Sequence, residues 1–446
     1  MRFFARISSV LFGFLLLFQY LSAFLSTKII LMGRYFLILF SISCLCSTFI
    51  VAQTKKSTAK KFVTNIKTGA ENLDTYLPLL KDKRVGLFAN QTSVVGDKHL
   101  VDVLLKAHVD IKKIFSPEHG FRGTADAGEH VSSSIDEATK LPIVSLYGEH
   151  HKATADDLKD VDVLLFDLQD VGCRFYTYIN SLQTFIESAI ETDKPIIVLD
   201  RPNPNGFYVD GPILEKGFES GVGVQHIPIV YGMTIGEYGK MLIGEKWLKT
   251  NPTAANSHFS YTVIPCKNYS HESYYEPPVG PSPNLPNMQS ILLYSSICFF
   301  EGTNVSLGRG TDKPFQIYGC PEFPNNLYSF TPVSTTGAKS PPLMNKKCYG
   351  YDLSAVKIDI TKKENQQINL SYIINAYKLF PNKDSFFLIP KKGNPLAGDF
   401  FFNKLSGNEN LMYQIMNNKS EAEIRKSWEP GLTAFKKIRA KYLIYP

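Results

Sequence analysis

The stretch IKKIFSPEHGFRG, residues 111–123, indicates the fold class, because it joins a short buried strand to a polar loop. Residues 111–115 have the apolar pattern of a strand, and Pro117 ends it. A carboxylate, an imidazole and a guanidinium then follow, from Glu118, His119 and Arg122. Open α/β sheets bind their ligands in loops at the carboxyl ends of strands, so we expect a functional site here. A polar turn that only connects two elements is the alternative that these residues leave open.

The same alternation of strand and helix continues on both sides of this stretch. Short apolar runs are followed by amphipathic spacing, which predicts a mostly parallel sheet with helices on both faces. No GxGxxG motif follows the first expected strand and no Walker loop occurs, so we expect no nucleotide cofactor. The expected strands are residues 84–89, 111–115, 141–146, 161–166 and 195–199, and the expected helices include residues 98–109 and 181–192.

Polar motifs follow four of the expected strands directly. They are N-Q-T (90–92), P-E-H-G (117–120), D-L-Q-D (167–170) and D-R-P-N (200–203). Because the carboxyl ends of parallel strands meet at one edge of a sheet, the four motifs predict one polar rim. Such a rim is typical of a binding or catalytic site.

A proline-rich segment between residues 277 and 286 predicts a domain boundary near residue 285. We expect a first domain over residues 83–285 and a smaller α+β domain over residues 286–446. Residues 320–350 are rich in Pro, Ser and Thr and are expected to be loop. Ser420 and Glu423 form the pattern of a capping box that opens a last helix, which Pro430 is expected to interrupt.

The N-terminal segment has the pattern of a targeting sequence. Residues 1–52 contain four basic side chains, no acidic one and two apolar runs, the second of which begins at Met32. We interpret Met32 as the true start and residues 53–82 as a linker and lead-in. A membrane anchor formed by the first run is the alternative. Either interpretation predicts an exported, periplasmic protein that meets the membrane only through this segment.

Charge excludes one class of partner. The formal net charge is +7, but residues 53–446 carry 44 basic against 41 acidic side chains. The basicity therefore belongs largely to the targeting segment, and we expect no nucleic-acid binding.

Glu118 is the best candidate for a catalytic carboxyl group. Hydrolysis of a glycosidic bond needs a protonated carboxyl group and commonly a second carboxylate. Arginines suited to bidentate capture of a carboxylate, or to structural ion pairs, are Arg122, Arg174 and Arg309. Histidines 119, 130, 150 and 151 fit no established spacing of metal ligands, so we expect no metal. Candidates for the second carboxylate, which the residues do not rank, are Asp126, Glu129, Asp167, Asp170 and Glu301.

Taken together, the motifs resemble those of the NamZ-type exo-β-N-acetylmuramidase family, which acts on bacterial peptidoglycan. The motifs are SPEHGFRG (116–123), LYG (146–148), DLQDVGCRFYTYI (167–179), DRPNPNG (200–206) with VDGP (209–212), PSPNLP (281–286) and FEGTNVSLGRGT (300–311). The resemblance covers about residues 83 to 446. It implies a Rossmann-like domain, a smaller second domain and an active site in the cleft between them.

The resemblance also implies an activity and a set of site residues. The expected reaction releases N-acetylmuramic acid from the non-reducing end of peptidoglycan fragments, with Glu118 as general acid. The expected catalytic residues are Glu118, His119 and Glu301, and the expected substrate-binding residues are Arg122, Tyr147, Asp167, Gln169, Asp170, Arg174, Tyr176, Asn203, Asn304 and Arg309. A binding module for wall fragments and a metal-dependent amidase or deacetylase are the alternatives.

Overall fold

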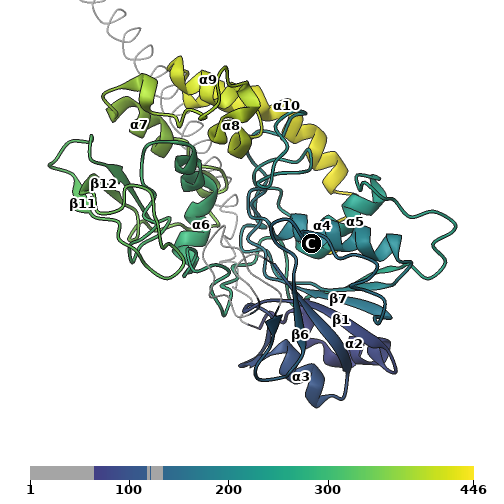
Figure 1. Ribbon diagram of the computed structural model, residues 1–446. Helices are drawn as coiled ribbons and strands as arrows, with labels where there is room; N and C mark the ends of the chain where they lie inside the picture. The colour runs from purple at the N-terminus through teal and green to yellow at the C-terminus, as the bar shows by residue number, and fades with distance from the viewer. Residues whose placement is uncertain (1–64, 118–120, 122–133) are drawn as a thin grey trace, which may run out of the picture. The chain divides into compact units, whose positions relative to one another are not determined.

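The structure is a computed structural model that describes residues 65–117, 121 and 134–446, which fall into one compact unit. Its first part is a seven-stranded sheet in the order β5-β6-β4-β1-β7-β8-β9 (Figure 1). All neighbouring strands are parallel except β5 and β6. The predicted mostly parallel sheet is confirmed, and β5 and β9 add a strand at each edge. The bounds are β1 Arg84–Ala89, β4 Asp110–Ser116, β5 Ser134–Ile135, β6 Pro142–Ser145, β7 Val163–Asp167, β8 Ile196–Leu199 and β9 Tyr261–Ile264.

Helices cover both faces of this sheet, as Figure 1 shows. Successive residues of β7 point to opposite sides: Val163 and Leu165 join one apolar cluster, Leu164 and Phe166 another. The first cluster holds side chains of α2 (Leu73–Leu80) and α3 (Leu100–Lys106), and the second those of α4 (Tyr178–Glu191) and α5 (Ile235–Gly244). Burial on both faces explains why the strands are continuously apolar rather than alternating.

Two short elements stand at the carboxyl ends of the strands. A hairpin of β2 (Val94–Val95) and β3 (Lys98–His99) follows β1, and the 3-10 helix η1 (Gly69–Glu71) packs beside β8 and β9. Gly69 approaches the sheet so closely that an added Cβ would lie 2.2 Å from the carbonyl oxygen of Ile264. Only glycine fits there.

The second part is a smaller α+β domain, as predicted. Its three-stranded antiparallel sheet has the order β10-β12-β11. Two of these strands correct the expected loop over residues 320–350, because β11 lies within it and β12 begins within it. The bounds are α6 Met288–Ile297, η2 Cys298–Gly302, β10 Ile317–Cys320, β11 Tyr328–Phe330, β12 Cys348–Asp352, η3 Lys363–Asn365, α7 Ser371–Leu379, η4 Lys383–Ser385, η5 Ala397–Asp399, α8 Phe401–Ser406, α9 Asn410–Met416 and α10 Glu421–Arg439.

The last helix departs from the prediction. The capping box of Ser420 and Glu423 is confirmed, but α10 continues through Pro430 to Arg439. Its buried stripe, Ile424, Trp428, Leu432 and Phe435, packs into the same apolar cluster as α4 and α6. We attribute the uninterrupted helix to this burial, which offsets the roughly 3 kcal/mol that an interior proline costs.

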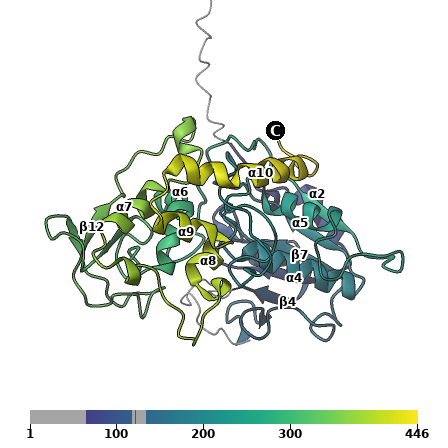
Figure 2. The same cartoon turned by 90° about the horizontal axis from the view of Figure 1, so that it is seen from above.

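The helix α10 ties the second part to the first. It runs across the molecule toward α5 (Figure 2). Arg425 pairs with Asp210 at 2.9 Å, and Arg439 Nε donates to the carbonyl oxygen of Gly232 at 2.8 Å. The apolar core is thus continuous across residue 285, and the domain boundary expected there stays a prediction.

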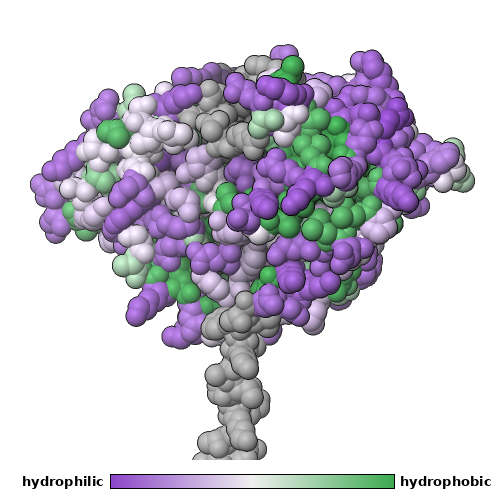
Figure 3. Space-filling view, turned by 90° about the horizontal axis from the view of Figure 1, so that it is seen from below, coloured by the Kyte–Doolittle hydropathy of each residue, from purple (hydrophilic) through white to green (hydrophobic). Residues whose placement is uncertain are grey.

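The described cysteines are all buried free thiols, at positions 173, 266, 298, 320 and 348. None of the helices in the described part combines the length and the hydropathy that crossing a bilayer requires. On the face drawn in Figure 3, hydrophilic residues predominate and hydrophobic ones gather in patches between them.

Candidate active site

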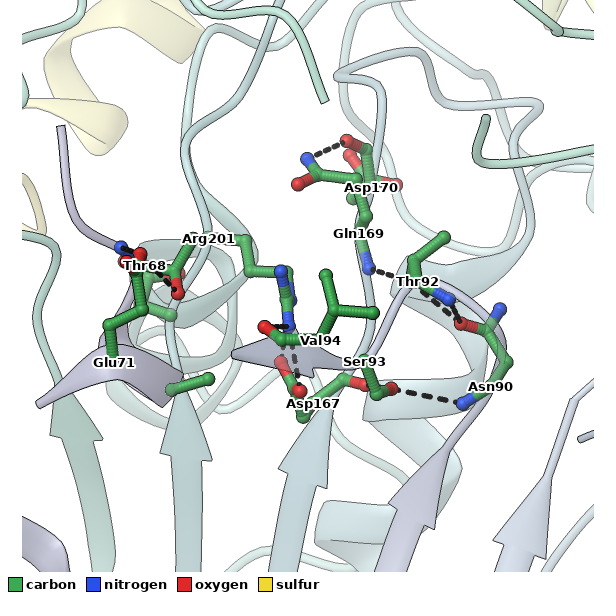
Figure 4. Close-up of polar contacts among 12 residues, drawn as sticks. Thr68, Glu71, Asn90, Thr92, Ser93, Val94, Asp167, Gln169, Asp170 and Arg201 are labelled. Carbon is green, nitrogen blue, oxygen red and sulfur yellow. Dashed lines mark hydrogen bonds and ion pairs between the residues drawn. The ribbon is translucent and has the colours of Figure 1, made fainter. Parts of the chain in front are cut away.

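Three of the four motifs of the predicted polar rim lie together in the described part of the chain, beginning where β1 ends; of P-E-H-G only Pro117 is described. The side-chain oxygen Oδ1 of Asn90 accepts hydrogen bonds from the backbone N–H of Thr92 at 2.9 Å and from its hydroxyl at 2.6 Å. Thr92 Oγ1 in turn accepts from the backbone N–H of Gln169 at 3.1 Å (Figure 4). Ser93 Oγ donates to the carbonyl oxygen of Asp167 at 2.5 Å. These bonds join the N-Q-T motif to the D-L-Q-D motif.

A buried ion pair joins the D-L-Q-D motif to the D-R-P-N motif. Arg201 Nε donates to Asp167 Oδ1 at 2.6 Å, and Arg201 Nη2 donates to Asp167 Oδ2 at 2.8 Å (Figure 4). Arg201 Nη2 also donates to the carbonyl oxygen of Val94 at 3.1 Å. The two charged side chains are 1% and 0% exposed. The pair holds the ends of β7, β8 and the β2–β3 hairpin together.

Asp170, the last residue of the D-L-Q-D motif, is also buried. Its Oδ2 accepts hydrogen bonds from the hydroxyl of Tyr231 and from the backbone N–H of Gly172, the latter at 2.7 Å. Burial raises the pKa of the Asp170 carboxyl group to about 6, although both hydrogen bonds act in the opposite direction. The neighbouring Gln169 donates from its side-chain amide to the carbonyl oxygens of Asp170 and Pro202, each at 2.8 Å.

Two further predicted residues also have internal partners. Arg174 is fully buried, and its N–H groups donate to the carbonyl oxygens of Pro212, Ile227 and Leu405. Burial without a carboxylate lowers the pKa of its guanidinium to about 9. Asn203 donates to the carbonyl oxygen of Met233 at 2.8 Å. The described contacts of Asp167, Gln169, Asp170, Arg174 and Asn203 are thus internal to the protein, and their substrate-binding role stays a prediction.

The PSPNLP segment connects the rim to the second part. Its Pro281 carbonyl oxygen accepts from the hydroxyl of Tyr176 at 2.7 Å and from Gln91 Nε2 at 3.1 Å. Three residues later, Asn284 Nδ2 donates to the carbonyl oxygen of Gly337 at 2.7 Å. The segment therefore touches the first sheet on one side and the 337–343 loop on the other.

That loop forms one wall of a cavity of about 670 Å³. Glu301 and Arg309 line it and form an ion pair: Arg309 Nε donates to Glu301 Oε1 at 2.9 Å, and Nη2 donates to the same oxygen at 2.5 Å. Asn304 also lines the cavity, while its side chain donates to the carbonyl oxygen of Ser385 at 2.7 Å. The three residues predicted from the FEGTNVSLGRGT motif thus lie together. Pockets of this volume accommodate small ligands.

The segment that leads to Glu118 leaves the sheet at a fixed position. It follows β4, whose last residue, Ser116, is buried between β1 and β6. Phe121 is also buried, and its ring packs edge-on against His99 with 4.8 Å between ring centroids. The predicted site residues Glu118, His119 and Arg122 lie outside the described residues, as do Asp126 and Glu129.

Tyr147 is half-buried just beyond β6, at the same end of the sheet as the rim. Among the residues that the structure describes, no group of three or more His, Cys, Asp or Glu side chains is placed to hold a metal ion. Of the four histidines considered as ligands, His119 and His130 lie outside the described residues, and His150 pairs with Asp157 at 3.1 Å.

Two important residues were not singled out from the sequence. Arg201 stands in the quoted D-R-P-N motif, but a pairing with Asp167 across 34 positions has no signature in a single sequence. Asn284 stands in PSPNLP, which the sequence marked as a domain boundary and as one motif of the resemblance, without a role for this residue. Their positions within the motifs were the only available signal.

The comparisons with known proteins agree on one family. A family model described as "Exo-beta-N-acetylmuramidase NamZ, N-terminal" matches residues 85–289, and its C-terminal counterpart matches residues 292–445. The peptidoglycan beta-N-acetylmuramidase NamZ of Bacillus subtilis (strain 168) is 39% identical over 417 residues, which cover 88% of this chain and 94% of that protein.

Two crystal structures of DUF1343 family proteins from Bacteroides fragilis NCTC 9343 are similar in fold. One has a TM-score of 0.74 and 45% identity, and covers 86% of this chain and 99% of its own. The other has a TM-score of 0.69 and 27% identity, with 85% and 99% covered. Because the two family models together match most of the chain, and a relative is 39% identical over nearly its whole length, the chain belongs to the exo-β-N-acetylmuramidase NamZ family.

Proposed function

We propose that this protein releases N-acetylmuramic acid from the non-reducing end of peptidoglycan glycan fragments, with Glu118 as general acid. The family to which the chain belongs makes it a glycoside hydrolase that acts on peptidoglycan. One observation carries the finer proposal: the match to the family runs through both parts of the chain, and the described motifs of both parts meet around the PSPNLP segment.

The role of Glu118 follows from its place in the chain. It stands two residues beyond Ser116, where β4 ends between β1 and β6. The neighbouring strand ends are cross-linked by Asn90, Thr92 and Gln169, which gives the end of β4 a rigid surrounding. A carboxyl group that follows this strand end can protonate the leaving oxygen of a glycosidic bond. His119 and Arg122, in the same motif, are proposed to assist catalysis and substrate binding.

Competing assignments for a catalytic carboxyl group are less suited. Asp167 is fully buried, and both of its side-chain oxygens already accept hydrogen bonds from Arg201. Glu301 already accepts two N–H groups from Arg309 at one oxygen, and it stands in the second part of the chain, away from the strand ends that form the rim. Both are therefore poor general acids, and the proton is assigned to Glu118.

The place of action is proposed to be outside the cytoplasm. The basic and apolar pattern of residues 1–52 supports export, and peptidoglycan lies outside the inner membrane. Detection of the protein in the periplasmic fraction supports this proposal, whereas confinement to the cytoplasm contradicts it.

The activity is tested with a chromogenic β-N-acetylmuramide and the matching β-N-acetylglucosaminide, each with and without EDTA. We expect release from the muramide alone and no effect of EDTA. Release from neither contradicts the proposal and favours a binding module for wall fragments; loss of release in EDTA favours a metal-dependent enzyme.

The role of Glu118 is tested with Glu118→Gln, which keeps the size of the side chain and removes the proton donor. We expect kcat to fall at least 100-fold while KM changes little, since general acids contribute about 10²–10⁴-fold. Full activity of the variant excludes Glu118 as the acid.

A further inference from the structure

The cavity lined by Glu301 and Arg309 contains an ion pair that the proposed proton transfer does not use. Its walls are mainly apolar, and its ionised lining includes the pair of Glu301 and Arg309. The apolar walls come from different segments: Phe300 from η2, Leu388 from the segment after η4, and Phe401 from α8. A hydrogen bond between this ion pair and a ligand is stronger beside apolar walls than in water, because the local dielectric constant is lower.

Arg309 is held in place by the turn that carries it. It stands between Gly308 and Gly310, whose φ angles are +87° and +77°. A Cβ at Gly310 would lie 2.4 Å from the carbonyl oxygen of Val333, so a larger residue does not fit. The guanidinium carbon lies 4.9 Å from the centroid of the Phe315 ring, which is a cation–π contact. The head group is therefore fixed before any ligand arrives.

The ion pair has hydrogen-bonding capacity left over. Both bonds from Arg309 go to Oε1 of Glu301, so within the described residues Glu301 Oε2 and Arg309 Nη1 have no hydrogen-bond partner. The two side chains are 21% and 20% exposed. An acceptor on Glu301 and a donor on Arg309 thus remain unused in a pair of residues that lines the cavity. A sugar hydroxyl, which both donates and accepts, matches such a pair.

We propose that this cavity binds the non-reducing terminal sugar of the glycan, and that Glu301 and Arg309 recognise its free C4 hydroxyl group. The pair carries no net charge, so its unused acceptor and donor suit a neutral hydroxyl; Lys339, which also lines the cavity, has an interaction of its own. In a longer chain the C4 oxygen forms a glycosidic bond and has no proton to donate to Glu301, so an internal sugar is rejected. The inference rests on the proposed exo-acting function and gives it a structural cause.

The position of the cavity agrees with this role. Asn284 holds the 337–343 wall through the carbonyl oxygen of Gly337, and Pro281, three residues earlier, holds the rim through Tyr176. The cavity wall and the rim are therefore held by the same four residues of chain, 281–284. Substitutions in the ion pair are expected to affect binding rather than the proton transfer.

The test compares Glu301→Gln with the wild type on a chromogenic β-N-acetylmuramide and on its 4-O-methyl derivative. We expect Glu301→Gln to raise KM about 10-fold or more with little change in kcat, because the variant loses a charged hydrogen-bond acceptor for the sugar hydroxyl. Methylation should weaken the wild type by a similar factor and the variant little further. A wild-type KM in the variant, or equal methylation penalties in both proteins, overturns the inference.

A matched control is available in the same region. Lys313 and Asp352 form an ion pair of 2.6 Å with 30% and 25% exposure, and neither residue lines the cavity. Asp352→Asn is expected to leave KM unchanged. Two results separate the two proposals. If the wild type does not turn over the chromogenic muramide, the exo-hydrolase is refuted. If calorimetry gives equal affinities of the wild type and Glu301→Gln for free N-acetylmuramic acid, the cavity assignment is refuted.

Discussion

Removal of Arg201 tests whether the rim depends on its buried ion pair. In Arg201→Met the methionine keeps part of the apolar packing, but Asp167 loses two charge-assisted hydrogen bonds of 2.6 and 2.8 Å. The carbonyl oxygen of Val94 loses a third bond. Because both charged side chains are at most 1% exposed, water cannot replace these partners. Breaking a buried pair by removing one member costs about 3–5 kcal/mol, so we expect the free energy of unfolding to fall by about 4 kcal/mol.

The measurement is denaturant unfolding followed by circular dichroism, with the double variant Asp167→Asn/Arg201→Met alongside. The double variant removes the stranded charge and should be more stable than Arg201→Met alone. Arg84→Met is the control, because Arg84 pairs with Asp162 at 2.7 Å on the surface, where such pairs contribute little. If Arg201→Met loses less than 1 kcal/mol, the rim does not depend on this pair and the reasoning is refuted.

Two further predictions concern stability. Burial raises the pKa of Asp170 to about 6. Between about pH 4 and pH 6 the folded state therefore retains a proton that the unfolded chain has lost. The contribution of this group to the free energy of unfolding falls as pH rises through that interval. Asp170→Asn should remove about 2 kcal/mol of that pH dependence between unfolding curves at pH 4.5 and 7.5; an unchanged slope contradicts it. Pro430 is exposed in the middle of α10, so Pro430→Ala should raise the free energy of unfolding by about 1–3 kcal/mol, and a lower unfolding midpoint would contradict this.

Much of the first part was predictable from local pattern. Strand periods, helix spacing and the polar motifs after four strands are properties of neighbouring residues, and the strands at 84–89 and 196–199 were found within one residue of their bounds. The rim itself was predictable because parallel strands end at one edge. The motif set also indicated the family, since its order along the chain is more specific than any single motif.

The sequence therefore determined the class of sheet, the place of the rim and the family. Only the tertiary structure decided that Arg174 is buried among carbonyl groups, that Arg201 holds Asp167, and that Glu301 and Arg309 share a cavity wall. It also decided that α10 continues through Pro430. The physical reason is common to all four: local pattern specifies what a residue prefers, but burial and the partner met across many positions determine whether its charge is paired and whether its local cost is offset.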